Sequence, residues 1–198
     1  DSSPYTQRYF GSMFSVTKKM RKFDLHDQIR SLPRTMADGA FDTIDQSYAD
    51  TLLNGWSTTY SDIYGATVAS VGPDGLALFS TLHTNNINSN TYRNQIKDSS
   101  ATENPPLSRD AMVQARVDAS QHTDPNGLKR SVMLDTLLVP MALEDLAERL
   151  LYSTQIPGSA NNDVNPLKGK IKTIKTWARL DEDNAGNDRS AYWFMYDS

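Results

Sequence analysis

The chain has 198 residues, a formal net charge of −4 at pH 7 and a hydrophobic content of 38%, which is low for a compact globular protein. It contains no cysteine, which excludes disulfides, thiolate metal sites and cysteine nucleophiles. The acidic balance argues against a nucleic-acid-binding domain, because such domains usually carry a basic stripe. The sequence has no basic-then-apolar signal segment and no apolar run near the ~18–20 residues that span a bilayer, so no membrane partner is expected.

Residues 1–23 carry large apolar side chains at irregular spacing. They are Tyr5, Tyr9, Phe10, Met13, Phe14, Val16, Met20 and Phe23. This spacing is not typical of a helix, and it predicts an extended arm or a hairpin strand, called here the N-terminal arm. A basic run of Lys18, Lys19, Arg21 and Lys22 lies in its last part. The simpler interpretation of this run is a solvated edge, and the alternative is a patch that faces a second subunit or DNA.

The next segment has two runs of apolar residues at helical spacing. They are Leu25, Ile29 and Leu32, and then Phe41, Ile44, Tyr48 and Leu52. We expect these residues to form a stripe that faces the core. Pro33 either interrupts the helix or begins a second one at its first turn. Asn54 and Gly55 are typical of a helix end.

Two short strands are predicted at residues 67–71 and 76–82, because the sequence Gly-Pro-Asp-Gly between them is a strong turn signal. Residues 84–106 form a long polar loop rich in asparagine, and loops of this length are usually functional or disordered. Pro105 and Pro106 close the loop and mark a candidate domain boundary.

A further helix is predicted to begin after Ser108, which is a favourable N-cap, with Asp110 well placed in the first turn. Its apolar stripe consists of Met112, Ala115 and Ala119. The Asp-Pro-Asn-Gly sequence at residues 124–127 ends this helix.

The strongest strand prediction is residues 132–139. Its last part has three consecutive apolar residues, Leu137, Leu138 and Val139, which indicate a strand covered on both faces. Pro140 then opens an amphipathic helix with one apolar face, formed by Leu143, Leu146, Ala147, Leu150 and Leu151. Two more strands are predicted at residues 170–180 and 191–196, around an acidic turn at residues 181–188.

The residues that could carry chemistry do not form a recognisable site. The three histidines, His26, His83 and His122, lack the close spacing of a local metal motif, and each is interpreted as a surface or hydrogen-bonded residue. The acidic run at 181–188 lacks the ligand pattern of an EF-hand, which favours a solvated turn. The aromatic residues at 192–196 could stack on bases, but without a basic groove a buried strand is favoured.

The sequence also lacks a phosphate-binding glycine loop and the nucleophile elbow of serine hydrolases. We therefore predict no catalytic residues, no cofactor-binding residues and no metal ligands, and a protein that needs no cofactor and is not an enzyme.

Residues 74–83 read DGLALFSTLH and resemble the DG-x-x-LFS-x-x-H segment of Mu-like major head subunits and related major capsid proteins of tailed phages. The resemblance continues in the same order along the chain. It includes an asparagine-rich loop, LS at residues 107–108 opening a helix, LLVP at 137–140, N-P-L-x-G at 165–169 and YWF at 192–194. Each piece is weak alone, and their shared order is what makes the resemblance specific.

This resemblance implies an α+β protein with the Hong Kong 97-type phage capsid fold. Residues 1–23 would be the extended loop or N-terminal arm, residues 24–106 the peripheral domain with its spine helix, and residues 107–198 the axial domain. Family members usually continue after the tryptophan strand and return to the peripheral domain. That return is expected to be missing from this span, which ends at Ser198. A start at Asp1 leaves open processing by a maturation protease or a longer parent chain.

The resemblance further implies a structural protein, the major capsid subunit of a phage or prophage head, which self-assembles into an icosahedral shell enclosing double-stranded DNA. The implied partners are copies of itself in hexamers and pentamers, portal and scaffold or protease proteins, and packaged DNA contacted without sequence specificity. The implied location is the virion capsid, after synthesis in the bacterial cytoplasm. The alternatives are an encapsulin-type compartment shell, a metal-dependent hydrolase that uses His83, and a binding module built on residues 137–152.

Overall fold

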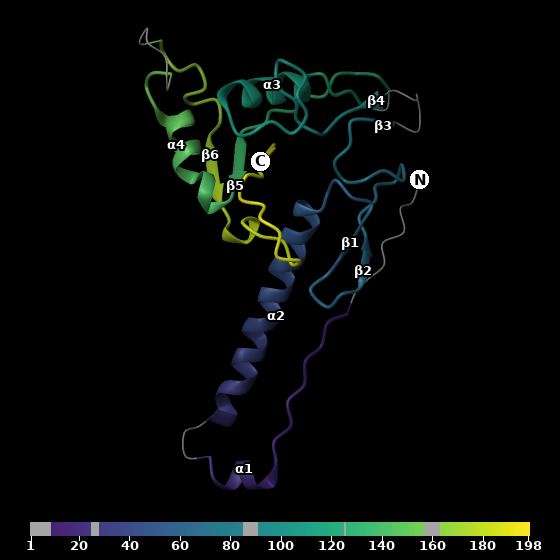
Figure 1. Cartoon of the computed structure of the whole chain (residues 1–198), viewed down its shortest axis with the longest axis vertical. Coiled ribbons are helices and arrows are strands. Elements are labelled where there is room, and N and C mark those ends of the chain that lie inside the picture. Colours follow the sequence, from purple (N-terminus) through teal and green to yellow (C-terminus); the bar gives the residue numbers. More distant parts are fainter. Residues whose placement is uncertain (1–8, 25–27, 85–90, 125, 157–162) are drawn as a thin grey trace.

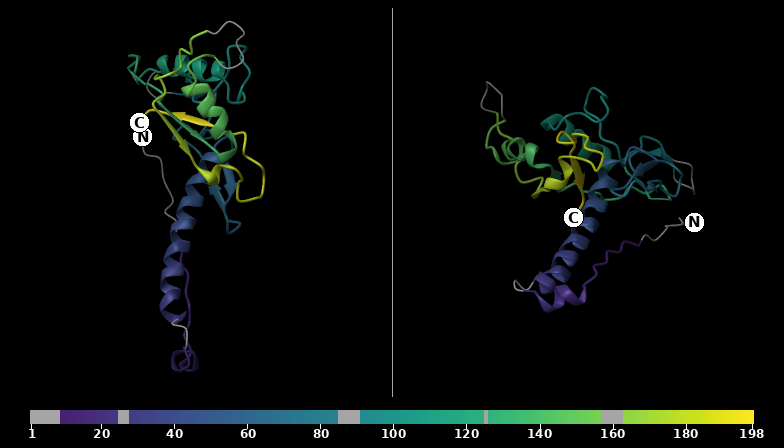
Figure 2. Two further views of the ribbon diagram at one scale, coloured as in Figure 1. Left: turned by 90° about the vertical axis from the view of Figure 1, so that its left-hand side faces the viewer. Right: turned by 60° about the horizontal axis from the view of Figure 1, so that its bottom comes forward.

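The computed structural model describes residues 9–24, 28–84, 91–124, 126–156 and 163–198. It is a mixed α+β structure in which one long helix leads into a more globular part with small sheets (Figure 1). The helix α2 (Gln28–Leu53) extends away from the globular part, and α1 (Lys18–Lys22) lies near its far end. Residues 9–17 of the N-terminal arm run back from α1 toward the globular part (Figures 1 and 2). No described helix is long and apolar enough to cross a membrane.

The helix α2 is continuous over 26 residues, so the predicted break or restart at Pro33 is wrong. Pro33 lacks the N–H that would bond the carbonyl four residues earlier. The loss falls in the second turn of α2, close to the N-terminal end of the helix, and Pro33 itself is exposed. The predicted helix end is confirmed, since α2 stops at Leu53. Gly55 is required there by close packing: a Cβ on it would lie 2.6 Å from the ring of Phe79.

The described part of the N-terminal arm has no helix or strand over residues 9–17, but the short helix α1 follows, which the sequence did not predict. Thr17 stabilises the start of α1, because its side-chain oxygen accepts a hydrogen bond from the Met20 backbone N–H (3.2 Å). The basic side chains of α1 are exposed, in agreement with a solvated edge. Tyr5 and Leu25, which belonged to the predicted apolar patterns, lie outside the described residues.

Two small antiparallel pairs of strands follow α2. They are β1 (Thr59–Ser61) with β2 (Thr67–Ala69), and β3 (His83–Thr84) with β4 (Thr91–Tyr92). The strand predicted at residues 67–71 is confirmed in β2, whereas the strand predicted at 76–82 is wrong apart from one bridge between Ala77 and Val71. The backbone of that segment bonds to scattered partners: the Phe79 N–H donates to Gly55 (2.7 Å) and the Ser80 N–H to the Asn94 side chain (2.9 Å).

The central sheet has the strand order β6–β5–β7. Its middle strand β5 (Thr136–Val139) pairs in parallel with β6 (Thr173–Thr176) and antiparallel with β7 (Phe194–Tyr196). The turn η1 (Met141–Leu143) and the helix α4 (Glu144–Tyr152) follow β5, and α4 lies beside β6 (Figure 1). The strands predicted at residues 132–139 and 170–180 are thus shorter than expected, and the second ends in a turn, η2 (Ala178–Leu180).

The core packs α3 (Arg109–Ser120) and α4 against one face of β5. Its buried residues are Leu107, Ala111, Met112, Leu137, Val139, Ala147, Leu151, Leu167, Ile171 and Trp193. The predicted cap of α3 is confirmed, because Ser108 Oγ accepts a hydrogen bond from the Ala111 N–H (3.2 Å). The predicted stripe of α3 is buried as expected. On α4, Leu150 is only half-buried, whereas Leu151 is 1% exposed.

Candidate functional site

The middle of α2 carries an apolar surface that the rest of the chain does not cover. Phe41 is 72% exposed, Ile44 is 48% exposed and Tyr48 is 67% exposed. We call these three residues the helical stripe. The prediction that they face the core is wrong. The end of α2 that joins the globular part buries Ala49 and Leu53 instead, and these lie roughly a third of a turn around the helix from the stripe.

The described part of the N-terminal arm is a second uncovered apolar surface. Met13 is 93% exposed and Tyr9 is 85% exposed, although Phe10 touches Tyr64 next to β1, with ring centroids 5.5 Å apart. Burying one such side chain is worth about 1.5–3 kcal/mol, and the isolated chain leaves most of that unrealised. Exposed apolar surfaces of this kind mark sites of protein interaction.

Arg179 and Trp177 link α2 to the segment that follows β6. Arg179, in η2, donates from Nε to Asp45 (2.7 Å), from Nη2 to Asp42 (2.6 Å) and from Nη1 to Gln46 (3.2 Å). The Trp177 indole N–H also donates to Asp45, at 3.4 Å. The three α2 residues share one side of the helix, so a planar guanidinium can contact them together. We call this group the arginine clasp; sequence reasoning missed it because its members are more than 130 residues apart.

The resemblance motif at residues 74–83 forms a turn that is closed by a contact between its first and last residues. Gly75 adopts a φ of 76°, which permits the tight turn, and the Asp74 carboxylate meets Nδ1 of His83 at 2.6 Å. The other ring nitrogen of His83 lies 3.2 Å from the carbonyl oxygen of Leu78. Burial opposes ionisation of Asp74, but the hydrogen bonds from His83 and the backbone outweigh it, so the pKa of Asp74 lies below its usual value. Both ring nitrogens of His83 therefore face protein acceptors.

The other two histidines and the acidic turn do not assemble a site. His122 contacts the carbonyl oxygen of Arg93 through Nε2 (2.7 Å), in agreement with a hydrogen-bonded role, and His26 lies outside the described residues. The solvated-turn prediction is wrong for Asp183, which is 5% exposed and accepts hydrogen bonds from Arg189 Nε and Nη2 at 3.1 and 2.9 Å. Nearby, burial raises the pKa of Asp50. Among the described residues, no group of three or more His, Asp or Glu side chains is placed to hold a metal ion.

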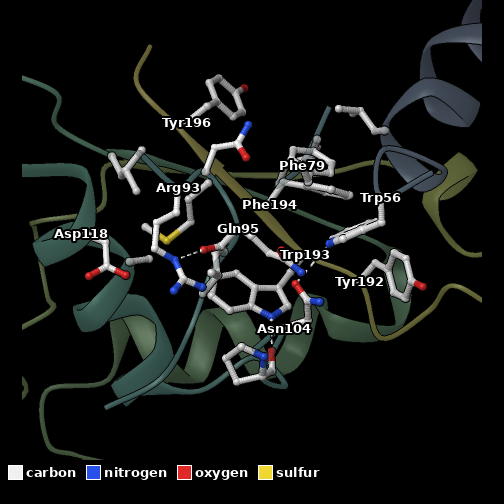
Figure 3. Close-up of a pocket in the computed structure, with 18 of the residues that line it drawn as sticks. Trp56, Phe79, Arg93, Gln95, Asn104, Asp118, Tyr192, Trp193, Phe194 and Tyr196 are labelled. Carbon is white, nitrogen blue, oxygen red and sulfur yellow. Dashed lines mark hydrogen bonds between the residues drawn. The ribbon is translucent and has the colours of Figure 1, made fainter. Parts of the chain in front are cut away.

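A cavity of about 1050 Å³ lies against the central sheet, on the side that carries Leu138 and Phe194. Four aromatic rings, of Trp56, Phe79, Tyr192 and Phe194, gather on one side of it, and Arg93 and Asp118 lie on the other (Figure 3). The centroids of Trp56 and Phe79 are 4.8 Å apart, and those of Phe79 and Phe194 are 5.6 Å apart. The predicted burial of the aromatic strand holds for Trp193, which is 7% exposed and donates its indole N–H to the Pro105 carbonyl (3.0 Å).

Two of the residues that line the cavity each have one buried polar atom, out of contact with the open space, that finds no hydrogen-bond partner within the described parts of the chain. The atoms are Nη2 of Arg93 and Oδ2 of Asp118. Arg93 uses its Nε to donate to the Gln95 carbonyl (3.0 Å), and its nearest ionic partner through Nη2 is Glu103 at 3.9 Å. Asp118 accepts a hydrogen bond from Gln114 through its other oxygen (2.9 Å). Buried polar groups are normally paired, so these two atoms require an explanation.

The described residues thus leave apolar surfaces uncovered on α2 and on the arm, and the charged groups around Arg179, Asp183 and Asp74 pair with one another within the chain. The comparison with protein families identifies the class of protein, since the family model for phage capsid protein matches residues 2–197. The chain therefore belongs to the phage capsid protein family. A search of curated proteins and a search of solved structures gave no significant match.

Membership of this family supports a structural role in the virion capsid and assembly into a multimeric shell, and it supports a protein that is not an enzyme. The mixed α+β structure with small sheets is consistent with a phage capsid fold.

Proposed function

We propose that the chain is a major capsid subunit of a phage or prophage head, with the Hong Kong 97-type fold, and that its hexamers and pentamers form an icosahedral shell around double-stranded DNA. The observation that carries this proposal is the helical stripe together with the exposed arm, because both need a cover that one chain does not supply. In this assignment α2 is the spine helix of a peripheral domain at residues 24–106, and the central sheet belongs to an axial domain at residues 107–198.

The N-terminal arm is the element through which a subunit binds its neighbour. Its described apolar residues, Met13 above all, are exposed in the single chain. A neighbouring subunit would cover them and recover the hydrophobic free energy of burial. We therefore expect the arm to be mobile in an isolated subunit and ordered in the shell. Portal, scaffold or protease proteins and non-specific contact with DNA remain part of the proposal through the family resemblance.

A hydrolase centred on His83 is less well supported than a shell subunit. Its ring nitrogens face Asp74 and Leu78, and its side chain is 7% exposed. A metal ion or a substrate would have to displace one of these internal contacts.

The test is assembly of the full chain, followed by negative-stain microscopy and sedimentation, beside a variant that lacks residues 1–23. We expect the full chain to form closed shells and the shortened variant to assemble weakly or not at all, with a nearly unchanged thermal transition. Met13→Ser should weaken assembly, whereas Leu128→Ser, at a residue 69% exposed on the loop after α3, should not. Full assembly of the shortened variant would remove the arm from the proposal, and absence of shells from the full chain would refute the capsid role.

A further inference from the structure

We propose that the turn at residues 74–83 is a pH-sensitive switch, which is closed while both ring nitrogens of His83 carry a proton and loosens when the ring loses one of them. The switch lies within one chain, so it is independent of the shell function proposed above. It makes the connection between α2 and the central sheet respond to pH.

The ring of His83 lies between two acceptors. Its Nδ1 is 2.6 Å from Oδ2 of Asp74, and its Nε2 is 3.2 Å from the carbonyl oxygen of Leu78. A neutral imidazole has one N–H and one lone pair, so it can donate to only one of these acceptors. The doubly protonated ring donates to both. The side chains of His83 and Asp74 are 7% and 8% exposed, which leaves water little access to replace a lost contact.

Asp74 is the ionised partner that this arrangement requires. Its Oδ1 accepts a hydrogen bond from the Leu76 N–H (3.2 Å), and the Thr84 N–H also donates to the carboxyl group. Burial opposes ionisation, but the hydrogen bond from His83 and those from the backbone keep the pKa of Asp74 below its usual 3.8. Asp74 therefore has no proton at neutral pH to donate to a neutral ring, and both protons must come from His83.

The titratable groups next to the ring are Asp74 in the turn and Tyr92 of β4, and His122 lies beyond Tyr92. Tyr92 stacks on His83 with ring centroids 5.3 Å apart, and it meets the ring of His122 edge-on at 5.8 Å. Nε2 of His122 lies 2.7 Å from the Arg93 carbonyl oxygen, so one N–H satisfies that contact. Two histidines thus lie on either side of Tyr92, and the contacts of His83 are the ones that need a second proton.

Loss of one proton leaves His83 with an unfavourable contact. If Nδ1 keeps its proton for Asp74, the lone pair of Nε2 faces the Leu78 oxygen, and two acceptors then lie 3.2 Å apart in a buried place. The Leu78 oxygen keeps a hydrogen bond from Nδ2 of Asn94 (2.7 Å), so it can separate from the ring. The contact that closes the turn is therefore weakened.

The same turn connects the end of α2 with the central sheet. The Phe79 N–H donates to the Gly55 carbonyl just after α2 (2.7 Å). The Phe79 ring packs on Phe194 of β7, with centroids 5.6 Å apart (Figure 3). Because Phe79 lies inside the segment that Asp74 and His83 close, a looser turn weakens both contacts.

The first test measures the protons on His83 in the full chain. Histidine is the side chain whose charge ordinarily changes between about pH 5 and about pH 8, and the nitrogen NMR shifts of the ring distinguish the doubly protonated form from both neutral forms. We expect both nitrogens of His83 to be protonated at the acidic end of this range and one to be unprotonated at the alkaline end. A ring that keeps one protonation state throughout the range would overturn the inference.

The second test measures hydrogen exchange of the Phe79 and Ser80 amides, which donate to Gly55 and to the Asn94 side chain. After correction for the intrinsic effect of pH on exchange, we expect their protection to fall several-fold from about pH 5 to about pH 8, together with the titration of His83. His83→Gln should remove most of this pH dependence. His122→Gln, the matched control, should retain it.

Protection that does not change with pH in the unmodified chain would overturn the inference, and so would an equal fall in His83→Gln. The NMR titration of the unmodified chain decides the question even where His83→Gln does not fold. Both measurements are made on a single subunit, so a failure to form shells would refute the shell function and leave this result unchanged.

Discussion

The central sheet and the long helix α2 use the same kinds of side chain in opposite ways. Around β5, Leu137, Val139 and Leu151 are at most 1% exposed, because α3 and α4 supply the opposing surface. Along α2, Phe41 and Tyr48 are 72% and 67% exposed. Both regions have apolar residues at regular spacing. Such spacing therefore marks a surface to be covered, but it does not show whether the covering surface belongs to the same chain.

The largest effect on stability is expected inside the core. Leu151→Ala removes a fully buried side chain and leaves a cavity between α4 and the sheet, which should lower the free energy of unfolding by about 2–5 kcal/mol. Leu128→Ala, at a residue 69% exposed, is the control and should change it by less than about 0.5 kcal/mol. Chemical denaturation measures both. Equal losses of unfolding free energy in the two variants would show that Leu151 does not belong to the core.

An intermediate effect is expected at the junction of the two regions. Arg179→Met removes the charged hydrogen bonds to Asp42 and Asp45, which should lower the free energy of unfolding by about 1–2 kcal/mol and speed hydrogen exchange in the middle of α2. Arg149→Met is matched to it, because its ion pair with Asp145 (2.8 Å) is exposed within one helix and contributes little. If exchange in α2 is the same in both variants, the clasp does not hold the helix.

A further difference in stability should appear only at acidic pH. A hydrogen bond from Lys172 is the main cause that holds the pKa of Asp135 at about 2, below its usual 3.8. A carboxylate whose pKa is lowered by folding stabilises the folded state above the unfolded pKa, and this contribution is lost as the pH falls from about 4 to about 2. Asp135→Asn should therefore make the stability of the sheet region less dependent on pH in that window. Thermal unfolding at several pH values gives the slope, and an unchanged slope would contradict the assignment.

The smallest effect on stability, and one of the largest on assembly, is expected on α2. Phe41→Ala exchanges an exposed ring for a good helix former, so the free energy of unfolding should change by less than about 0.5 kcal/mol. Shell formation, followed by sedimentation, should be weakened if the helical stripe is covered by a neighbour. Leu128→Ala again serves as the control. A large loss of stability in Phe41→Ala would mean that the stripe packs within its own chain.

Sequence reasoning succeeded where the cause is local. The cap at Ser108 and the buried stripe of α3 follow from residues within one helix, and the middle strand follows from its consecutive apolar residues. It failed where burial depends on contacts with a segment that is distant in the sequence. Nothing near Phe41 shows that the rest of the chain leaves it uncovered.

The same holds for the candidate site. The pairing of Arg179 with Asp45 joins residues 134 positions apart, and the buried Asp183 was taken for a solvated residue. The contact between Asp74 and His83 could have been predicted more easily from the sequence. Both residues stand in the resemblance motif, and a carboxylate near a histidine beyond a glycine turn is a pairing that the spacing allows.

The attachment of α2 toward one end gives the subunit a lever. The helix has 26 residues and is about 39 Å long, and about 24 Å of it lies between the arginine clasp at residues 42–46 and the far end at Gln28. A rotation of about 10° at the arginine clasp would carry that far end, and α1 near it, through about 4 Å. The packing of β5, α3 and α4 need not change during that swing. Small adjustments at one guanidinium would thus translate into large displacements at the tip, where α1 and the arm lie.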